Sequence, residues 1–327
     1  MKRFMSFVMA MVMVLSLIPV VSLAAETRTV YWDPVSGADS NDGLTETNPV
    51  KTAAAAYGAL SGAEEGILVL LSTLKLTALT NFPTCGIPVT ITAKTGAEGI
   101  SSSANINFNG ETTLENMTLT LTKASTSVVI GGGGHKFTVG EGVTCVPFSN
   151  TTSDYYFCLQ GGLAGAGVAS TDLTVKSGTW RNIYFGSMSR VVSGDAKLTM
   201  TGGTAATVTP SYSSSVNGNV SATIGGTARI TSYLYAGCWT KGDVGGNVDI
   251  TLQEGASVYR LFCAGNGTGN VAGWSSRHLL LGRASGWGVR AAGHSSAGST
   301  APTPTSTPTG QAGGQGDPAY IHPQQSE

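Results

Sequence analysis

Charged side chains are scarce in this sequence. They make up 11% of the 327 residues, whereas an ordinary globular domain has about 25%. The formal net charge is −1, so no basic surface is available for nucleic acid or acidic lipid, and we expect neither as a partner. The chain is instead rich in glycine, with 45 residues, and in Ser, Thr, Val, Ile and Leu. This composition is typical of a β-rich protein with many turns.

The five cysteines also lack a recognisable pattern. They are widely spaced, at Cys85, Cys145, Cys158, Cys238 and Cys263. An odd number leaves at least one thiol unpaired, and no CxxC or Cys/His cluster has the spacing of zinc ligands. We therefore expect small core residues, with one disulfide possible, and no structural zinc.

Only the N-terminus carries a long apolar run. Lys2 and Arg3 precede an unbroken apolar stretch, Phe4–Val21, which the small residues Ser22, Ala24 and Ala25 close. Positive charge, an apolar run and a small-residue cleavage site indicate a secretory signal peptide, here residues 1–25. An uncleaved membrane anchor is the alternative, because about 18 apolar residues can span a bilayer. No later segment is as apolar, so we expect a secreted or surface protein without a membrane span after cleavage.

The middle of the chain repeats. The segments 173–183, 198–208, 220–230 and 248–258 each alternate apolar and polar residues, reach a glycine and resume with a short apolar run. Alternation at period two indicates half-buried strands. The recurring glycines Gly178, Gly203, Gly226 and Gly255 are 25, 23 and 29 residues apart. An antiparallel sandwich has no reason for such a period, whereas stacked repeats do. We predict an all-β, parallel β-helix of about eight coils over residues 67–273.

Residues 26–66 differ from the repeats. A strand leads to a polar turn and then to an Ala-rich segment, for which Thr52 is a suitable N-cap. We predict a strand, a turn and a short capping helix over the open end of the first coil. Asp39, Asn41 and Asp42 cluster oxygen ligands in the turn, which makes calcium possible. Asx side chains more often bond their own backbone in turns, and we favour that interpretation. No other cofactor is expected.

This N-terminal segment carries a family resemblance. Its matching residues are Gly37, Asp39, Asn41, Asp42, Gly43, Pro49 and Thr52. With them, the chain resembles exported right-handed β-helix proteins of the pectate-lyase-like superfamily. Residues 110–143 also resemble β-helix surface proteins of gut Firmicutes. The likeness covers about residues 30 to 273 and implies a single-stranded right-handed β-helix, while saying little about activity.

The last part of the chain, residues 274–327, has a different composition. Alternation stops, and Ala301–Gly310 is a Pro/Thr-rich stretch that cannot form a packed core. We predict a disordered tail. It is either a natural wall-spanning segment or the product of a shifted reading frame, and we favour the second because the repeat breaks off in mid-coil.

Catalytic signals are weak. Polysaccharide-cleaving β-helices need paired or clustered carboxylates, but the acids between residues 67 and 273 are scattered singly. Stacking could still bring Asp195, Asp243 or Asp249 together across coils. His135 is the one histidine among the repeats, and we expect a solvated turn residue there. A polysaccharide lyase or glycoside hydrolase therefore remains the alternative function, and we name no catalytic residue.

Binding is the favoured function. Tyr184, Tyr235 and Trp239 lie near the glycines that close successive repeats. If Ile183 and Phe185 face the core, alternation turns Tyr184 outward, where it could contact a ligand; packing within the core is the alternative. We therefore expect an adhesin-like protein for binding or display. Its expected partner is a polysaccharide, a cell-surface glycan or a surface protein.

Overall fold

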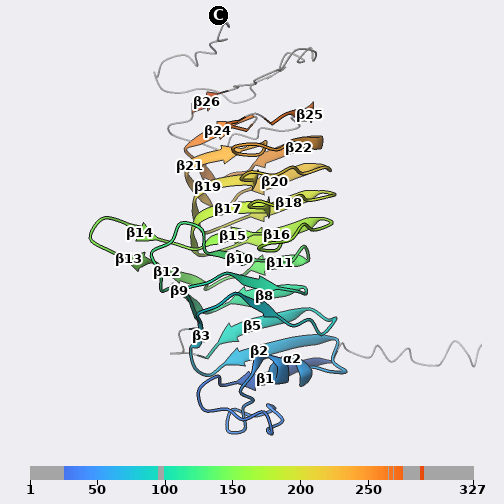
Figure 1. The fold of residues 1–327 in the computed structure, drawn as a ribbon, viewed down its shortest axis with the longest axis vertical. Helices are drawn as coiled ribbons and strands as arrows, with labels where there is room; N and C mark the ends of the chain where they lie inside the picture. The colour runs from blue at the N-terminus through green and yellow to red at the C-terminus, as the bar shows by residue number, and fades with distance from the viewer. Residues whose placement is uncertain (1–25, 95–98, 264, 268, 275–287, 291–327) are drawn as a thin grey trace, which may run out of the picture.

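The computed structural model describes residues 26–94, 99–263, 265–267, 269–274 and 288–290. In these residues the chain winds into a parallel β-solenoid with one short helix, and its strands stack like rungs along a single axis (Figure 1). The predicted all-β solenoid class is confirmed. The predicted signal peptide and most of the predicted tail lie outside the described residues.

One of two ten-stranded sheets, which we call sheet A, is paired in parallel throughout. In stacking order its strands are β1 (Thr27–Trp32), β2 (Glu65–Leu70), β5 (Val89–Ala93), β8 (Thr112–Glu115), β11 (Lys136–Val139), β16 (Thr171–Val175), β18 (Ala196–Met200), β20 (Val220–Ile224), β22 (Val244–Leu252) and β25 (Val271–Trp274).

Two further sheets complete the cross-section of the solenoid. Sheet B is short and contains β3 (Leu74–Leu76), β6 (Gly99–Ser102), β9 (Thr118–Leu121) and β12 (Thr144–Val146). Sheet C contains β4 (Thr80–Phe82), β7 (Ile106–Phe108), β10 (Val129–Gly131), β15 (Cys158–Gln160), β17 (Thr179–Ser187), β19 (Thr204–Ser211), β21 (Arg229–Tyr235), β24 (Arg260–Phe262) and β26 (Gly288–Arg290), with β23 (Ser257–Val258) also paired to β21. From β2 to β24 these strands make eight turns.

The coil changes shape half-way along the axis. Up to β12 each coil has three short strands, whereas from β16 to β21 it has a strand of sheet A and one long strand of sheet C, such as β17 with 9 residues. A hairpin of β13 (Phe148–Ser149) and β14 (Asp154–Tyr155) marks the change and projects from the solenoid (Figure 1). It is the only antiparallel pair in the described residues, which excludes the sandwich alternative there.

The register gives the length of each coil. Leu173 pairs with Leu198, Leu198 with Ala222, and Ala222 with Ile250, which are steps of 25, 24 and 28 residues. These steps confirm the predicted superperiod. The pair Phe137–Leu173 spans 36 residues because the hairpin is inserted in that coil.

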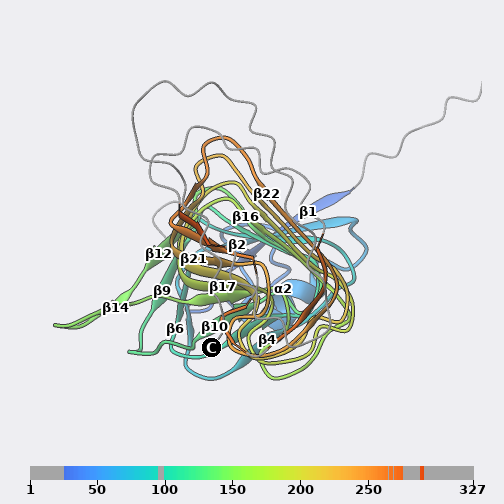
Figure 2. The ribbon, with the colours of Figure 1, turned by 90° about the horizontal axis from the view of Figure 1, so that it is seen from above.

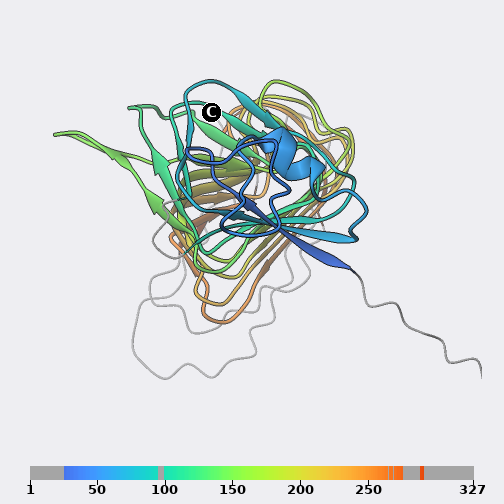
Figure 3. The same cartoon turned by 90° about the horizontal axis from the view of Figure 1, so that it is seen from below.

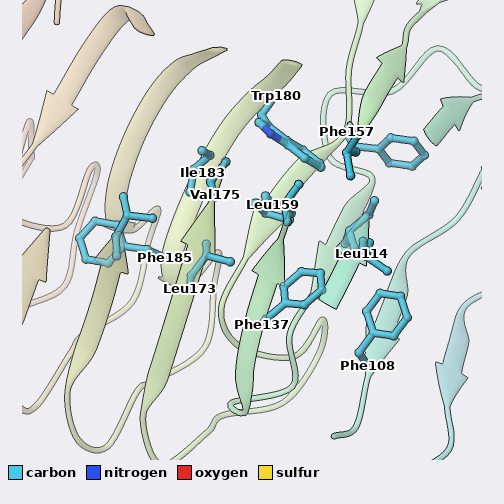
Figure 4. Close-up of a cluster of buried hydrophobic side chains, with 14 of the residues drawn as sticks. Phe108, Leu114, Phe137, Phe157, Leu159, Leu173, Val175, Trp180, Ile183 and Phe185 are labelled. Atoms are coloured by element: carbon cyan, nitrogen blue, oxygen red, sulfur yellow. The ribbon is translucent and has the colours of Figure 1, made fainter. Parts of the chain in front are cut away.

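Inward-facing side chains of all three sheets fill one continuous core (Figure 4). Aromatic rings stack through its first coils: the ring centres of Phe82 and Phe108 are 4.8 Å apart, and those of Phe108 and Phe137 are 5.4 Å apart. Burial of each such ring stabilises the fold by about 1.5–3 kcal/mol. Consecutive coils are therefore joined by packing as well as by backbone hydrogen bonds. All five cysteines are free thiols, so no disulfide contributes.

Glycines allow the turns between sheets A and C to stack closely. Gly178 and Gly203, at φ +87° and +75°, occupy equivalent positions one residue before the paired Thr179 and Thr204. The glycine spacing placed Gly226 and Gly255 at the same position of the repeat. They lie instead three and two residues before Arg229 and Ser257, which pair with each other. A Cβ atom on Gly255 would lie 2.1 Å from the carbonyl oxygen of Gly226 in the coil below.

The predicted N-terminal cap is confirmed. Helix α2 (Ala53–Gly58) lies across the open end of the solenoid (Figure 3), with Ala56 and Tyr57 buried against it. The Oγ1 atom of Thr52 accepts a hydrogen bond from the Ala55 amide at 3.2 Å, as expected of an N-cap.

Two parts of the predicted disordered tail, residues 274–327, differ from the sequence-based expectation. Trp274 ends β25, which pairs with β22, and Gly288–Arg290 forms β26, which pairs in parallel with β24. The described residues contain no helix long and apolar enough to cross a membrane.

Candidate binding site on the outer face of sheet C

The outer face of sheet C carries one continuous column of side chains. Backbone register aligns Asn81, Asn107, Gly131, Gln160, Tyr184 and Thr209, and the column continues in the next two coils with Tyr235 and Phe262. The residues on either side of these in each strand point inward, so the column points outward. None of these eight described positions is acidic. The column is amide-rich toward the N-terminus and aromatic toward the C-terminus.

A loop covers the amide half of this column. The chain after β15 bends back across two coils, and the amide of Ala164 donates a hydrogen bond to Oδ1 of Asn107 at 2.9 Å. Gln160 is 1% exposed, and its Oε1 accepts a hydrogen bond from the Met188 amide at 3.0 Å. The loop and these bonds leave Asn107 and Gln160 buried, so these two amides are closed to a ligand.

Tyr184 points outward, as alternation predicted. Ile183 and Phe185 belong to the central core, whereas Tyr184 packs in a separate small cluster with Val129 and Cys158. It is nevertheless only 2% exposed, and its Oη accepts a hydrogen bond from Nδ2 of Asn182 at 2.9 Å. Burial raises the pKa of its hydroxyl. Tyr184 therefore lies on the outer face beneath other rings, where it can support a ligand-binding surface rather than form it.

Tyr235 is held between two rings. Its centre lies 5.7 Å from that of Trp239 and 5.1 Å from that of Phe262, with interplanar angles of 23° and 20°. Both faces are thus covered, and burial raises the pKa of Tyr235 to about 12, with a smaller effect of Tyr233. This predicted ligand residue cannot offer a free face either.

Trp239 keeps part of its surface exposed. The edge-to-face contact with Tyr212, 5.3 Å between centres, complements its stacking on Tyr235. The Trp239 amide donates to the carbonyl oxygen of Ser211 at 2.7 Å, and the Thr240 amide and hydroxyl donate to that of Tyr212. Rings and backbone together fix the indole in one orientation.

The contacts join into a continuous group that we call the aromatic ladder. It extends over β17, β19, β21 and β24 and consists of Tyr184, Tyr212, Trp239, Tyr235, Tyr233 and Phe262. At its far end the guanidinium of Arg260 lies 4.9 Å from the ring centre of Tyr259 and 6.0 Å from that of Tyr233. Tyr259 is 54% exposed.

Tyr212, Tyr233, Tyr259, Arg260 and Phe262 were not identified from the sequence. One signal could have found two of them, because a step of 27 residues relates Tyr212 to Trp239 and Tyr235 to Phe262. The aromatic residues thus recur at nearly the same period as the glycines that close the repeats.

The three acids considered for catalysis do not share one site. Asp195 Oδ1 accepts hydrogen bonds from the amide and Nδ2 of Asn219, at 2.7 and 3.1 Å. Asp243 Oδ1 accepts from the Asn270 amide at 2.8 Å. Asp249 lies elsewhere, on the outer face of sheet A beside Ser221. The first two stabilise turns between coils, and among the described residues no three His, Cys, Asp or Glu side chains gather as a metal site.

The calcium candidates take part in the turns of the cap. Asp39 accepts hydrogen bonds from the amides of Lys51 and Thr52, and from the Thr52 hydroxyl at 2.8 Å, and these bonds lower its pKa. Asp42 Oδ1 accepts from the Leu44 amide at 3.0 Å and from Asn48. Asn41 donates its side-chain amide to the Pro49 carbonyl oxygen at 2.8 Å. Each of the three therefore has a role in holding the turn.

Comparison with known proteins adds no assignment: no protein-family model, curated protein or solved structure matches this chain. The function must therefore be argued from the geometry.

Proposed function

We propose that this chain is an exported β-helix protein, similar to pectate-lyase-like surface proteins, that binds a glycan on the aromatic ladder. The observation that carries the proposal is the partly exposed Trp239, whose ring is held by Tyr235 and Tyr212. The apolar C–H faces of sugar rings pack against flat aromatic side chains. A ring that is already fixed loses little conformational entropy when the ligand arrives.

The chemistry around Trp239 supports a glycan. The registered column of sheet C lacks acidic residues at its described positions, and Thr209 in it is fully buried and bonded to backbone. Aromatic rings with a few hydrogen-bonding groups form the usual lining of a small-molecule or sugar site. Arg260, placed over two tyrosine rings, supplies a cation at the edge of the ladder.

Affinity electrophoresis of the mature protein through gels containing soluble polysaccharides tests this proposal. Trp239→Ala should weaken retardation at least about tenfold, a loss of about 1.4 kcal/mol or more. Tyr155→Ala, in the hairpin remote from the ladder, is the matched control and should bind as the unmodified protein does. Equal binding by both variants, with unchanged melting temperatures, would show that the ladder is not the site.

A further inference from the structure

The outer face of sheet A carries a second regular column, in which Ile67 of β2 is followed by a threonine in every coil from β5 to β22. Backbone register aligns seven of them in consecutive coils, which we call the threonine row: Thr90, Thr113, Thr138, Thr174, Thr199, Thr223 and Thr251. Neighbouring strands of a sheet are about 4.8 Å apart, so the six steps of the row extend over about 29 Å.

Strand propensity alone does not explain this uniformity. The adjacent inward column changes freely among Ile, Leu, Val and Met, as in Leu114, Val139 and Met200. The next outward column changes more widely, with Lys136, Asp172 and Ser221 among its members. A half-exposed strand position accepts Val, Ile or Tyr as readily as Thr. Only the hydroxyl distinguishes threonine from valine, which has the same shape.

These hydroxyls are available for a ligand. All seven side chains are half-buried, so each methyl group packs against the sheet while part of the residue meets solvent. In the described chain, none of the seven Oγ1 atoms has a hydrogen-bond partner within the protein. A hydroxyl can donate one hydrogen bond and accept two. The row therefore offers a straight series of donors and acceptors.

The surroundings of the row indicate what can lie on it. Seen along the axis, the upper coils superimpose with little rotation, so the strands that carry the upper part of the row lie one above another (Figure 2). Beside it lie two ion pairs, Lys136–Glu111 at 2.8 Å and Lys197–Asp172 at 3.3 Å. These pairs cancel their charges but keep a hydrated edge, which suits a polyhydroxylated ligand better than an apolar one.

We propose that the threonine row is a second binding face, which takes an extended β-linked polysaccharide chain lying along the solenoid axis. One sugar residue of such a chain has nearly the length of one coil step. Successive sugar residues of the chain face opposite ways, so every second threonine of the row meets an equivalent group of the polymer. Many weak contacts in register add to a useful affinity for an ordered polymer. This face is separate from the aromatic ladder and does not depend on glycan binding there.

Retention on microcrystalline cellulose and on crystalline chitin tests the proposal. The measurements use the Trp239→Ala background, so that the aromatic ladder does not contribute. The triple variant Thr138→Val, Thr174→Val and Thr199→Val should lower retention on one of the two polymers at least about tenfold. The control, Thr118→Val with Thr120→Val on sheet B, removes two half-buried outward hydroxyls elsewhere and should leave retention unchanged.

The outcomes separate this face from a purely structural role. Valine keeps the shape and strand preference of threonine, so the triple variant should unfold at the same temperature or higher. No retention of the Trp239→Ala protein on either polymer would overturn the proposal. Equal loss in the triple variant and the control would do the same, and so would an effect of the row on ice growth but not on the polymers. Failure of the aromatic ladder alone would appear in the electrophoresis and leave this retention intact.

Discussion

Two glycines with the same backbone conformation should respond very differently to alanine. Gly62 and Gly255 both have φ +85°. A Cβ atom on Gly62 would meet nothing within 4 Å, whereas one on Gly255 would lie 2.1 Å from the carbonyl oxygen of Gly226. The pair therefore separates the cost of the backbone conformation from the cost of stacking one coil on another.

The magnitudes follow from this geometry. A left-handed alanine costs about 1–2 kcal/mol, and the stiffer unfolded chain offsets about 0.4–1 kcal/mol. Gly62→Ala should therefore lower the free energy of unfolding by about 1 kcal/mol. Gly255→Ala must also move two coils apart, at a cost of about 1–3 kcal/mol for overpacking. That shift strains the hydrogen bond from the Gly226 amide to the Glu254 carbonyl oxygen, which contributes about 0.5–1.5 kcal/mol.

Urea unfolding followed by circular dichroism measures both variants, and Gly255→Ala should be less stable than Gly62→Ala by about 2–4 kcal/mol. Because a solenoid can open locally, hydrogen exchange at the Gly226 amide is the second measurement. It should speed up in Gly255→Ala and stay slow in Gly62→Ala. Equal losses of stability together with unchanged exchange at Gly226 would refute the stacked arrangement of these turns.

Three further predictions concern the core, the cap and catalysis. Phe108→Ala removes the centre of the Phe82–Phe108–Phe137 stack and should cost about 3–5 kcal/mol in urea unfolding, with Phe108→Leu clearly milder; a loss below about 1 kcal/mol contradicts that packing. Hydrogen bonds from Thr52 lower the pKa of Asp39, so its stabilising effect is present above the usual aspartate pKa of about 3.9 and is lost as the pH falls through the lower folded-state pKa. Asp39→Asn should therefore make the melting temperature fall less steeply as the pH is lowered into the acid range. An unchanged dependence on acid pH counts against this account of the cap. Incubation with pectic polysaccharides, with or without calcium, should release no new reducing ends, and products that disappear in Asp195→Asn would favour the lyase or hydrolase alternative.

The fold was largely predictable because it depends on local alternation repeated at a fixed period. Alternation placed Ile183 and Phe185 inside and Tyr184 outside, and the glycine spacing gave the coil length. The hairpin at 148–155 was not predictable, since it occurs in one coil and breaks the period. The position of Gly226, two residues further from its strand than that of Gly203, was not predictable for a related reason. Turns of unequal length can connect strands that remain in register.

The candidate site was less predictable, because exposure of a side chain depends on residues from other coils. Tyr235 loses both faces to Trp239 and Phe262, of which the second is a coil away. Tyr184 is covered with the help of Tyr212, which follows a different strand. Whether a side chain points toward the core or away from it is a local property, which alternation in the sequence reveals. Whether an outward side chain is covered depends on other coils, and alternation does not reveal it.

Both proposed binding faces exist only if the coils are stacked in the register described above, and spin-label distances along the threonine row test this most directly. Labels at Thr90 paired with labels at Thr174, Thr199, Thr223 or Thr251 are measured by double electron–electron resonance, with the native cysteines replaced by alanine. The distance should grow by about 4.8 Å for each added coil, from about 14 Å to about 29 Å across the set. Distances that do not increase steadily with coil number would contradict the parallel in-register stack and, with it, both faces.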